Sequence, residues 1–148
     1  LNNSCILNSS NVFSSDGCSG KDAKKRELVF PLLMRNNCDF FSFKDSSFAI
    51  QKDRESTARV QLWKEFSLIN CFTLEISFCG PDFGKYEYFH FTYDMLKELA
   101  DSFCYSILDM NDPDQSKVKQ TMEEIEQNII KGIDKRDENV QKVSNNQE

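Results

Sequence analysis

The feature that most constrains this chain is a stretch of alternating side chains over residues 68–78. With Asn70 as the exception, one face of this stretch is apolar and carries Leu68, Phe72, Leu74, Ile76 and Phe78. A period of two residues predicts a β-strand with one buried face. The turn-forming sequence Gly80-Pro81-Asp82 ends the predicted strand.

Further short strands are predicted on both sides of this stretch. Residues 58–62 alternate small or apolar side chains with polar ones, as a half-buried strand does. Residues 48–50 and 86–91 are short apolar or aromatic pieces that fit extended structure.

Two helices are predicted towards the end of the chain. Thr92 is a good N-cap for a helix that runs through Asp109. The apolar face of this helix includes Leu96, Leu99, Phe103 and Ile107. After a break at residues 111–114, residues 115–133 predict a second helix with a narrow apolar stripe, formed by Val118, Met122, Ile125, Ile129 and Ile133.

The beginning of the chain has a different composition. Residues 1–23 are dominated by Ser, Asn, Gly and Asp, which bury too little apolar area to offset the entropy lost on ordering. They predict a disordered insertion or end. Leu28, Leu32 and Leu33 have helical spacing, but Pro31 is tolerated only near a first turn, so this helix is expected to be short or to begin late.

Composition excludes several classes of function. The 148 residues carry 18 Lys and Arg against 24 Asp and Glu, and this net charge of −6 argues against general nucleic-acid binding. No apolar run approaches the roughly 20 residues that span a bilayer, and no signal peptide is recognised. The six cysteines form no C-x-x-C pair, and reduced intracellular thiols are expected. The single histidine, His90, excludes a metal site with two histidines from this chain alone.

One carboxylate stands out in the predicted strand. Glu75 lies among Phe, Leu and Ile residues, and burial of an unpaired carboxylate is costly. Glu75 is therefore expected to pair, to bind a ligand or to take up a proton, and a carboxylate that faces a cleft is a reasonable general base. The alternative is an exposed strand glutamate, or one that forms a salt bridge with a residue such as Arg59.

A basic cluster precedes that strand. Lys52, Arg54 and Arg59 place three cations within eight residues of an acidic chain. The planar guanidinium group of Arg suits bidentate binding of a carboxylate, so the cluster could receive the carboxylates of a partner. The alternative is a solvated loop whose charge is balanced by Asp53 and Glu55.

Several short sequence words follow one another along the middle of the chain: F-A-I-Q-K (48–52), E-S-T-A-R-V (55–60), W-K (63–64), N-C-F-T-L-E-I-S-F-C-G (70–80), H-F-T (90–92), I-L-D (107–109) and D-P-D (112–114). Their order resembles that in the cytosolic carboxypeptidases, the intracellular branch of the M14 zinc metallocarboxypeptidases. The resemblance covers roughly residues 27–114. It departs from the family pattern at Ser56 and Ala58, where Gly is usual, and at Cys71 and Phe72, where Ser and Tyr are usual.

The resemblance implies roles for the candidate residues. Glu75 matches the family's general base, which activates a zinc-bound water and then passes the proton to the leaving amine. Because the family prefers acidic substrates, Arg59, with Lys52 and Arg54, is expected to bind glutamate carboxylates. The family's zinc ligands belong to words upstream of the matched part, so this chain is expected to hold no metal and to be inactive alone.

The resemblance also implies a fold and a setting. The fold class is expected to be α/β, a partial zinc-carboxypeptidase fold with a mixed central sheet flanked by helices. Residues 24–112 would form the C-terminal half of the catalytic domain, residues 113–134 a C-terminal helix and residues 135–148 a disordered tail. The implied function is zinc-dependent removal of C-terminal glutamates from proteins such as tubulin, in the cytoplasm and in association with microtubules.

Two other readings of the sequence stay open. One is a non-catalytic module that keeps the basic groove and binds acidic protein tails. The other is an unrelated helical adaptor built on residues 115–133. Neither nucleic acid nor a membrane is an expected partner.

Overall fold

The structure, a computed structural model, describes residues 5–9, 20–48 and 55–128. Its elements in chain order are β1 (Cys5–Ser9), α1 (Gly20–Asn37), α2 (Ala58–Phe66), β2 (Phe72–Ile76), the 3₁₀ turn η2 (Gly84–Tyr86), α3 (Tyr93–Asn111) and a helix over residues 116–128. Helices and strands are therefore both present, as the α/β prediction expects. The mixed central sheet and the carboxypeptidase fold stay predictions, because the described strands form one antiparallel pair.

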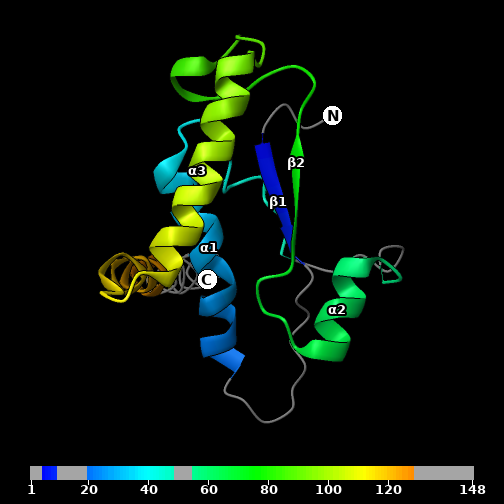
Figure 1. The fold of residues 1–148 in the computed structure, drawn as a ribbon, viewed down its shortest axis with the longest axis vertical. Helices are drawn as coiled ribbons and strands as arrows, with labels where there is room; N and C mark the ends of the chain where they lie inside the picture. Colours follow the sequence, from blue (N-terminus) through cyan, green and yellow to red (C-terminus); the bar gives the residue numbers. More distant parts are fainter. Residues whose placement is uncertain (1–4, 10–19, 49–54, 129–148) are drawn as a thin grey trace, which may run out of the picture.

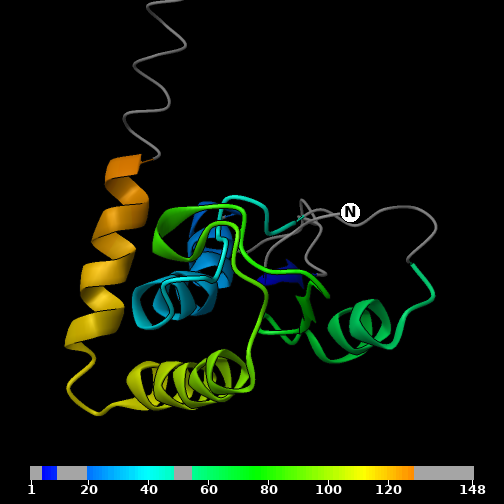
Figure 2. The same ribbon diagram turned by 90° about the horizontal axis from the view of Figure 1, so that it is seen from above.

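Helix α1 lies at the centre of the fold, and α3 runs beside it (Figures 1 and 2). One stretch of α1 is buried on all sides and consists of Val29, Phe30, Pro31, Leu32, Leu33 and Met34. The prediction of a short or late helix is wrong, since α1 has 18 residues and contains Pro31 in its interior. Proline in a helix interior costs roughly 3 kcal/mol, but burying one Leu or Phe side chain contributes about 1.5–3 kcal/mol, and α1 buries several.

Strands β1 and β2 form an antiparallel ribbon (Figure 1). Cys5 pairs with Ile76 at one end of the ribbon and Ser9 with Phe72 at the other. Both β1 and the first turn of α1 fall inside residues 1–23, where the composition predicts disorder, so part of that segment is ordered. The predicted domain boundaries themselves stay predictions. β2 is the middle of the strand that the alternation predicts over residues 68–78.

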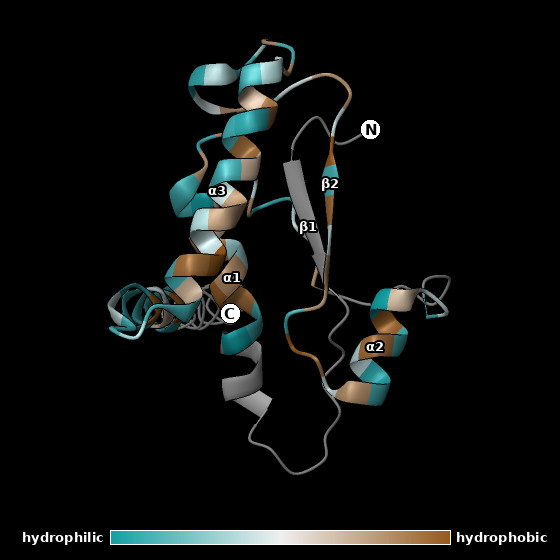
Figure 3. Ribbon diagram, in the orientation of Figure 1, coloured by the Kyte–Doolittle hydropathy of each residue, from teal (hydrophilic) through white to brown (hydrophobic). Residues whose placement is uncertain are grey.

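The prediction for α3 is confirmed at its start. The Thr92 side chain accepts a hydrogen bond from the Met95 backbone N–H at 3.3 Å, and the helix continues two residues beyond Asp109. The predicted apolar face of α3 is only partly buried. Met95, Leu99, Ser102 and Ser106 are the buried positions, whereas Leu96 and Ile107 are each 41% exposed. Figure 3 shows the mixture of apolar and polar residues around this helix.

Aromatic rings join these elements. Phe30 of α1 stacks on Phe72 of β2, with ring centroids 5.8 Å apart, and meets Phe103 of α3 edge to face at 5.6 Å. Phe40, which follows α1 and is completely buried, contacts Tyr86 and Phe91 edge to face. The loops after α1 and after β2 are thereby fixed to the same core.

Two of the shorter predicted strands are wrong. Residues 58–62 belong to helix α2, in which Val60 is completely buried and Ser67 ends the helix with a φ of 53°. A five-residue window of alternating polarity fits one buried helical position as well as it fits a strand. Residues 86–91 begin in η2 and continue through a turn in which Tyr88 has a φ of 70°. Most of the predicted strand 48–50 lies outside the described residues.

The last described helix packs on α1. Val118, Met122 and Ile125 contact the apolar side of α1, which confirms this part of the predicted stripe; Ile129 and Ile133 lie outside the described residues. Arg35 of α1 forms an ion pair with Glu124, in which Nη2 donates to both carboxylate oxygens, at 2.9 and 3.0 Å.

Asp109 connects α1, α3 and this helix. Its carboxylate accepts hydrogen bonds from Asn37 Nδ2 at 3.0 Å and from Lys117 Nζ. Burial alone would raise the pKa of Asp109, but the hydrogen bonds from Lys117 and Asn37, with the charge of Lys117, outweigh it and lower the pKa below the usual 3.8. Because the folded state binds the proton less tightly than the unfolded state, ionised Asp109 stabilises the fold, and this stabilisation is lost as the pH falls through the lowered pKa.

We therefore expect Asp109→Asn to lower the free energy of unfolding by about 1 kcal/mol at pH 7, and by progressively less as the pH falls below about 4. Urea unfolding at several pH values measures the difference. Asp101→Asn, at an exposed position of the same helix, is the matched control and should change little. An Asp109→Asn difference that stays constant down to pH 2 would contradict this role.

Candidate functional site

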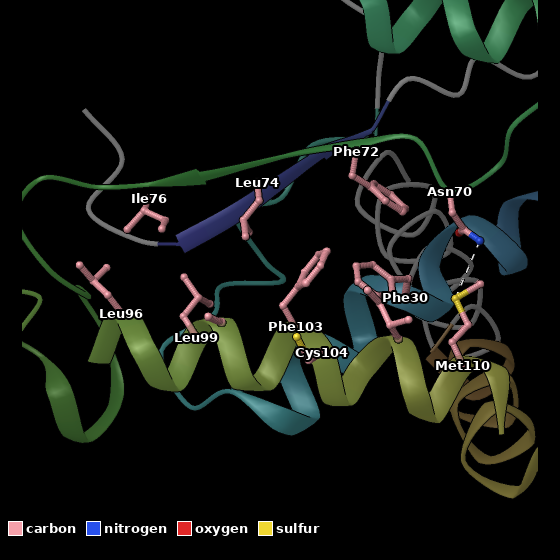
Figure 4. A pocket seen from close by; sticks show the side chains of 12 residues that line it. Phe30, Asn70, Phe72, Leu74, Ile76, Leu96, Leu99, Phe103, Cys104 and Met110 are labelled. Carbon is pink, nitrogen blue, oxygen red and sulfur yellow. Dashed lines mark hydrogen bonds between the residues drawn. The ribbon is translucent and has the colours of Figure 1, made fainter. Parts of the chain in front are cut away.

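Glu75 lies on the face of β2 opposite to the one that points towards α3 (Figure 4). Phe72, Leu74 and Ile76 point towards α3 (Figure 4), so the alternation of the strand places Thr73 and Glu75 on the opposite face. Glu75 is exposed rather than buried, and the prediction of its burial is therefore wrong. The alternation separated the two faces correctly, but α3 lies on the other one (Figure 4), and the face of Glu75 meets Arg59 of α2 instead.

Arg59 is brought to that same face of β2. Its Nη1 donates a hydrogen bond to the Thr73 hydroxyl at 3.2 Å, and its Nε is shielded from solvent. The Cys71 thiol donates to the Arg59 backbone carbonyl at 3.3 Å. Thr73 and Glu75 lie two residues apart on one face of β2. The guanidinium group of Arg59 is therefore held at the position next to Glu75 on that face.

The other two cations of the basic cluster, Lys52 and Arg54, lie outside the described residues. Glu55, which the sequence offered as a counter-charge for the cluster, forms an ion pair with Lys64 of α2 at 3.5 Å. Both of these side chains are largely exposed, so the pair contributes little to stability.

An apolar groove of about 620 Å³ lies between β2 and α3 (Figure 4). Phe72, Leu74 and Ile76 line one wall, and α3 forms the other. Among the described residues, no charged side chain lines this groove, and neither Glu75 nor Arg59 is part of its lining. The groove is therefore suited to apolar groups.

The loop after β2 is tightly closed. The Cys79 carbonyl accepts hydrogen bonds from the Phe91 N–H at 2.8 Å and from His90 Nδ1 at 3.2 Å. A Cβ atom at Gly80 would lie 1.8 Å from the Phe89 carbonyl oxygen, so only glycine fits there. His90 is exposed, and its hydrogen bond to the Cys79 carbonyl helps to close this loop.

The described residues do not fit a zinc site. They contain no group of three His, Cys, Asp or Glu side chains that could hold a metal ion. Among the described cysteines, Cys38, Cys71, Cys79 and Cys104 are free thiols, and burial raises the pKa of the Cys38 thiol to about 11. A thiol with that pKa stays protonated at neutral pH, which makes it a poor metal ligand.

The sequence did not identify the residues that hold Arg59. Thr73 and Cys71 lie within the predicted strand 68–78, and neither of them was assigned a role from the sequence. Their alternation with Glu75 was the available signal, but a contact with Arg59 depends on where α2 lies, and residues 58–62 were predicted to be a strand.

Comparison with known proteins finds relatives of this sequence. Cytosolic carboxypeptidase 3 of Bos taurus is 37% identical over 138 residues, which cover 86% of this chain and 14% of that protein. The Mus musculus protein of the same name is 39% identical over 118 residues, and cytosolic carboxypeptidase 2 of Homo sapiens is 37% identical over 123 residues. No protein-family model matches the chain.

The chain is homologous to a segment of the cytosolic carboxypeptidases. It spans 12–14% of the length of these relatives. In this segment, the residues Thr73 and Glu75 of the word T-x-E lie on the outward face of β2, and Gly80, which ends the longer word over residues 70–80, is the position where the Phe89 carbonyl leaves no room for a side chain. Within the described part of the segment, no helix has both the length and the apolar character needed to cross a bilayer.

Proposed function

We propose that this chain is the part of a zinc-dependent metallocarboxypeptidase that carries the general base, and that the enzyme removes C-terminal glutamate residues from proteins such as tubulin. Identity of 37–39% to cytosolic carboxypeptidases 2 and 3 over most of the chain supports this proposal. The activity is proposed for the full-length protein, with zinc ligands from other parts of it. A cytoplasmic location and association with microtubules belong to the same proposal.

Glu75 is the proposed general base. An exposed carboxylate on a strand can take a proton from the attacking water and later give it to the amine that leaves. The strand backbone, paired with β1, holds the Cα of Glu75 in a fixed register. The peptide to be cleaved would approach the outward face of β2.

The observation that carries the substrate assignment is the hydrogen bond from Arg59 to Thr73. It holds a cation on the same strand face as Glu75, where a substrate side chain next to the scissile bond could meet it. A guanidinium group binds a carboxylate through two parallel hydrogen bonds, which favours glutamate over a neutral residue. Lys52 and Arg54 are proposed to assist.

A pair of peptides tests the proposal in the full-length protein. One peptide ends in glutamates and the other has glutamine at the same positions. Arg59→Glu should lower kcat/KM for the glutamate peptide by about 10- to 100-fold, since a hydrogen bond to a charged group contributes about 1.5–3 kcal/mol. The glutamine peptide should be affected much less.

Lys64→Glu is the matched control, because it makes the same charge change on α2 at a side chain that pairs with Glu55. It should leave the preference for glutamate within about twofold, as expected for an exposed ion pair. If Arg59→Glu left the ratio of the two peptides unchanged, the substrate assignment would be wrong. If the wild-type protein bound the glutamate peptide without cleaving it, a non-catalytic module that binds acidic tails would replace the peptidase.

A further inference from the structure

Arg59 makes hydrogen bonds to residues 71 and 73, one through its backbone and one through its side chain. The guanidinium Nη1 donates to the Thr73 hydroxyl at 3.2 Å, and the Arg59 backbone carbonyl accepts from the Cys71 thiol at 3.3 Å. Cys71 directly precedes β2, and Thr73 lies two residues further along the chain, within the strand. The strand therefore fixes where the Arg59 side chain begins and in which direction it ends.

The hydrogen bond to Thr73 orients the guanidinium group of Arg59. A threonine hydroxyl carries no charge, so this contact itself places no acidic group beside the guanidinium. With Nε shielded from solvent, the side chain also has less freedom to leave the strand.

Thr73 is placed between the two residues that the proposed function uses. Glu75 is the next residue on the same face, so the direction in which Thr73 holds Arg59 sets the direction of the cation relative to the general base. An arginine that must be ordered on binding costs side-chain entropy, and prior ordering lowers this cost.

We propose that Thr73, assisted by Cys71, is a positioning residue that orients Arg59 for an acidic substrate side chain. The inference rests on the proposed function and adds two residues to it. Thr73 touches no reacting atom in this scheme; it acts through Arg59. It thereby contributes to the preference for glutamate and leaves the chemical step to Glu75.

Isosteric variants of the full-length protein test the inference. Thr73→Val keeps the shape and the strand preference but removes the hydroxyl, and Thr73→Ser keeps the hydroxyl. Thr73→Val should raise KM for the glutamate-ending peptide by about 3- to 10-fold, the effect of one hydrogen bond, with kcat nearly unchanged. Thr73→Ser should restore the wild-type KM, and the glutamine-ending peptide should respond to neither change.

A purely structural role predicts a different pattern. If Thr73→Val lowered kcat equally for both peptides, or if Thr73→Ser behaved like Thr73→Val, the positioning role would be wrong. Should Thr73→Val fail to fold, Cys71→Ala and Cys71→Ser form a second pair with the same expectation, smaller in size because a thiol is a weak donor.

Equilibrium binding separates this inference from the proposed function. If the wild-type protein cleaves neither peptide, the peptidase assignment fails, and the affinities of the same two peptides then decide the role of Thr73. Weaker binding of the glutamate peptide by Thr73→Val, but not by Thr73→Ser, would support the positioning role. Equal affinities among the three proteins, or no preference of the wild type for the glutamate peptide, would overturn it.

Discussion

Replacing Glu75 by Gln in the full-length protein is expected to lower the rate of glutamate removal by about 10²- to 10⁴-fold. Glutamine keeps the size and hydrogen-bonding shape of the side chain but cannot accept a proton, so it removes the contribution of a general base. Affinity for the glutamate-ending peptide should stay within about twofold of the wild type, since binding is assigned to Arg59. Single-turnover cleavage and equilibrium binding measure the two effects separately.

Glu65→Gln is the matched control, because Glu65 is an exposed glutamate on α2 and has no assigned role. It should leave both the rate and the affinity unchanged. A Glu75→Gln protein that cleaves as fast as the wild type would exclude Glu75 as the base, even if zinc and peptide still bind. The exposure of Glu75 makes this test selective, since substitution of an exposed strand residue usually changes stability by no more than about 0.5 kcal/mol.

Replacing Phe40 by Ala is expected to lower the free energy of unfolding by about 3–5 kcal/mol. Phe40 is completely buried and contacts the rings of Tyr86 and Phe91, so the substitution leaves a cavity that these rings cannot fill. Equilibrium urea unfolding of the chain measures the loss. Because a domain of this size has only about 5–15 kcal/mol of stability in total, partial unfolding at 25 °C is a second expected sign.

Phe78→Ala provides the matched control for this cavity. Phe78 follows β2 and is fully exposed, so the same chemical change should alter stability by less than about 0.5 kcal/mol. If the two variants lost equal stability, the described core around Phe40 would be wrong. The comparison also tests a sequence inference, because the alternation assigned Phe78 to the buried face of its strand.

The helices show which structural features could be predicted from neighbouring residues alone. For α3, the N-cap at Thr92 and the position of the helix followed from neighbouring residues, and the structure confirms both. For α1, local sequence was misleading, because the intrinsic cost of Pro31 argued against a long helix. The compensating burial comes from α3 and the helix over residues 116–128, which are distant in the sequence.

The candidate site was predicted in part. Glu75 and Arg59 were both selected from the sequence, and the structure brings Arg59 to the strand face that carries Glu75. The reason given for Glu75 was its burial, and that reason is wrong. The contacts of Thr73 and Cys71 with Arg59 could not be predicted, since they depend on residues 58–66 forming helix α2 and on where Arg59 of that helix lies relative to β2.

The sequence by itself determined the features that depend on neighbouring residues: the alternation of β2, the capped amphipathic helix α3 and the segment's kinship to the cytosolic carboxypeptidases. Only the tertiary structure decided that α1 continues through Pro31, that the face of β2 with Glu75 is exposed, and that Thr73 holds Arg59. The physical reason is that periodicity identifies the two faces of an element, whereas burial and side-chain contacts depend on which distant segment covers each face.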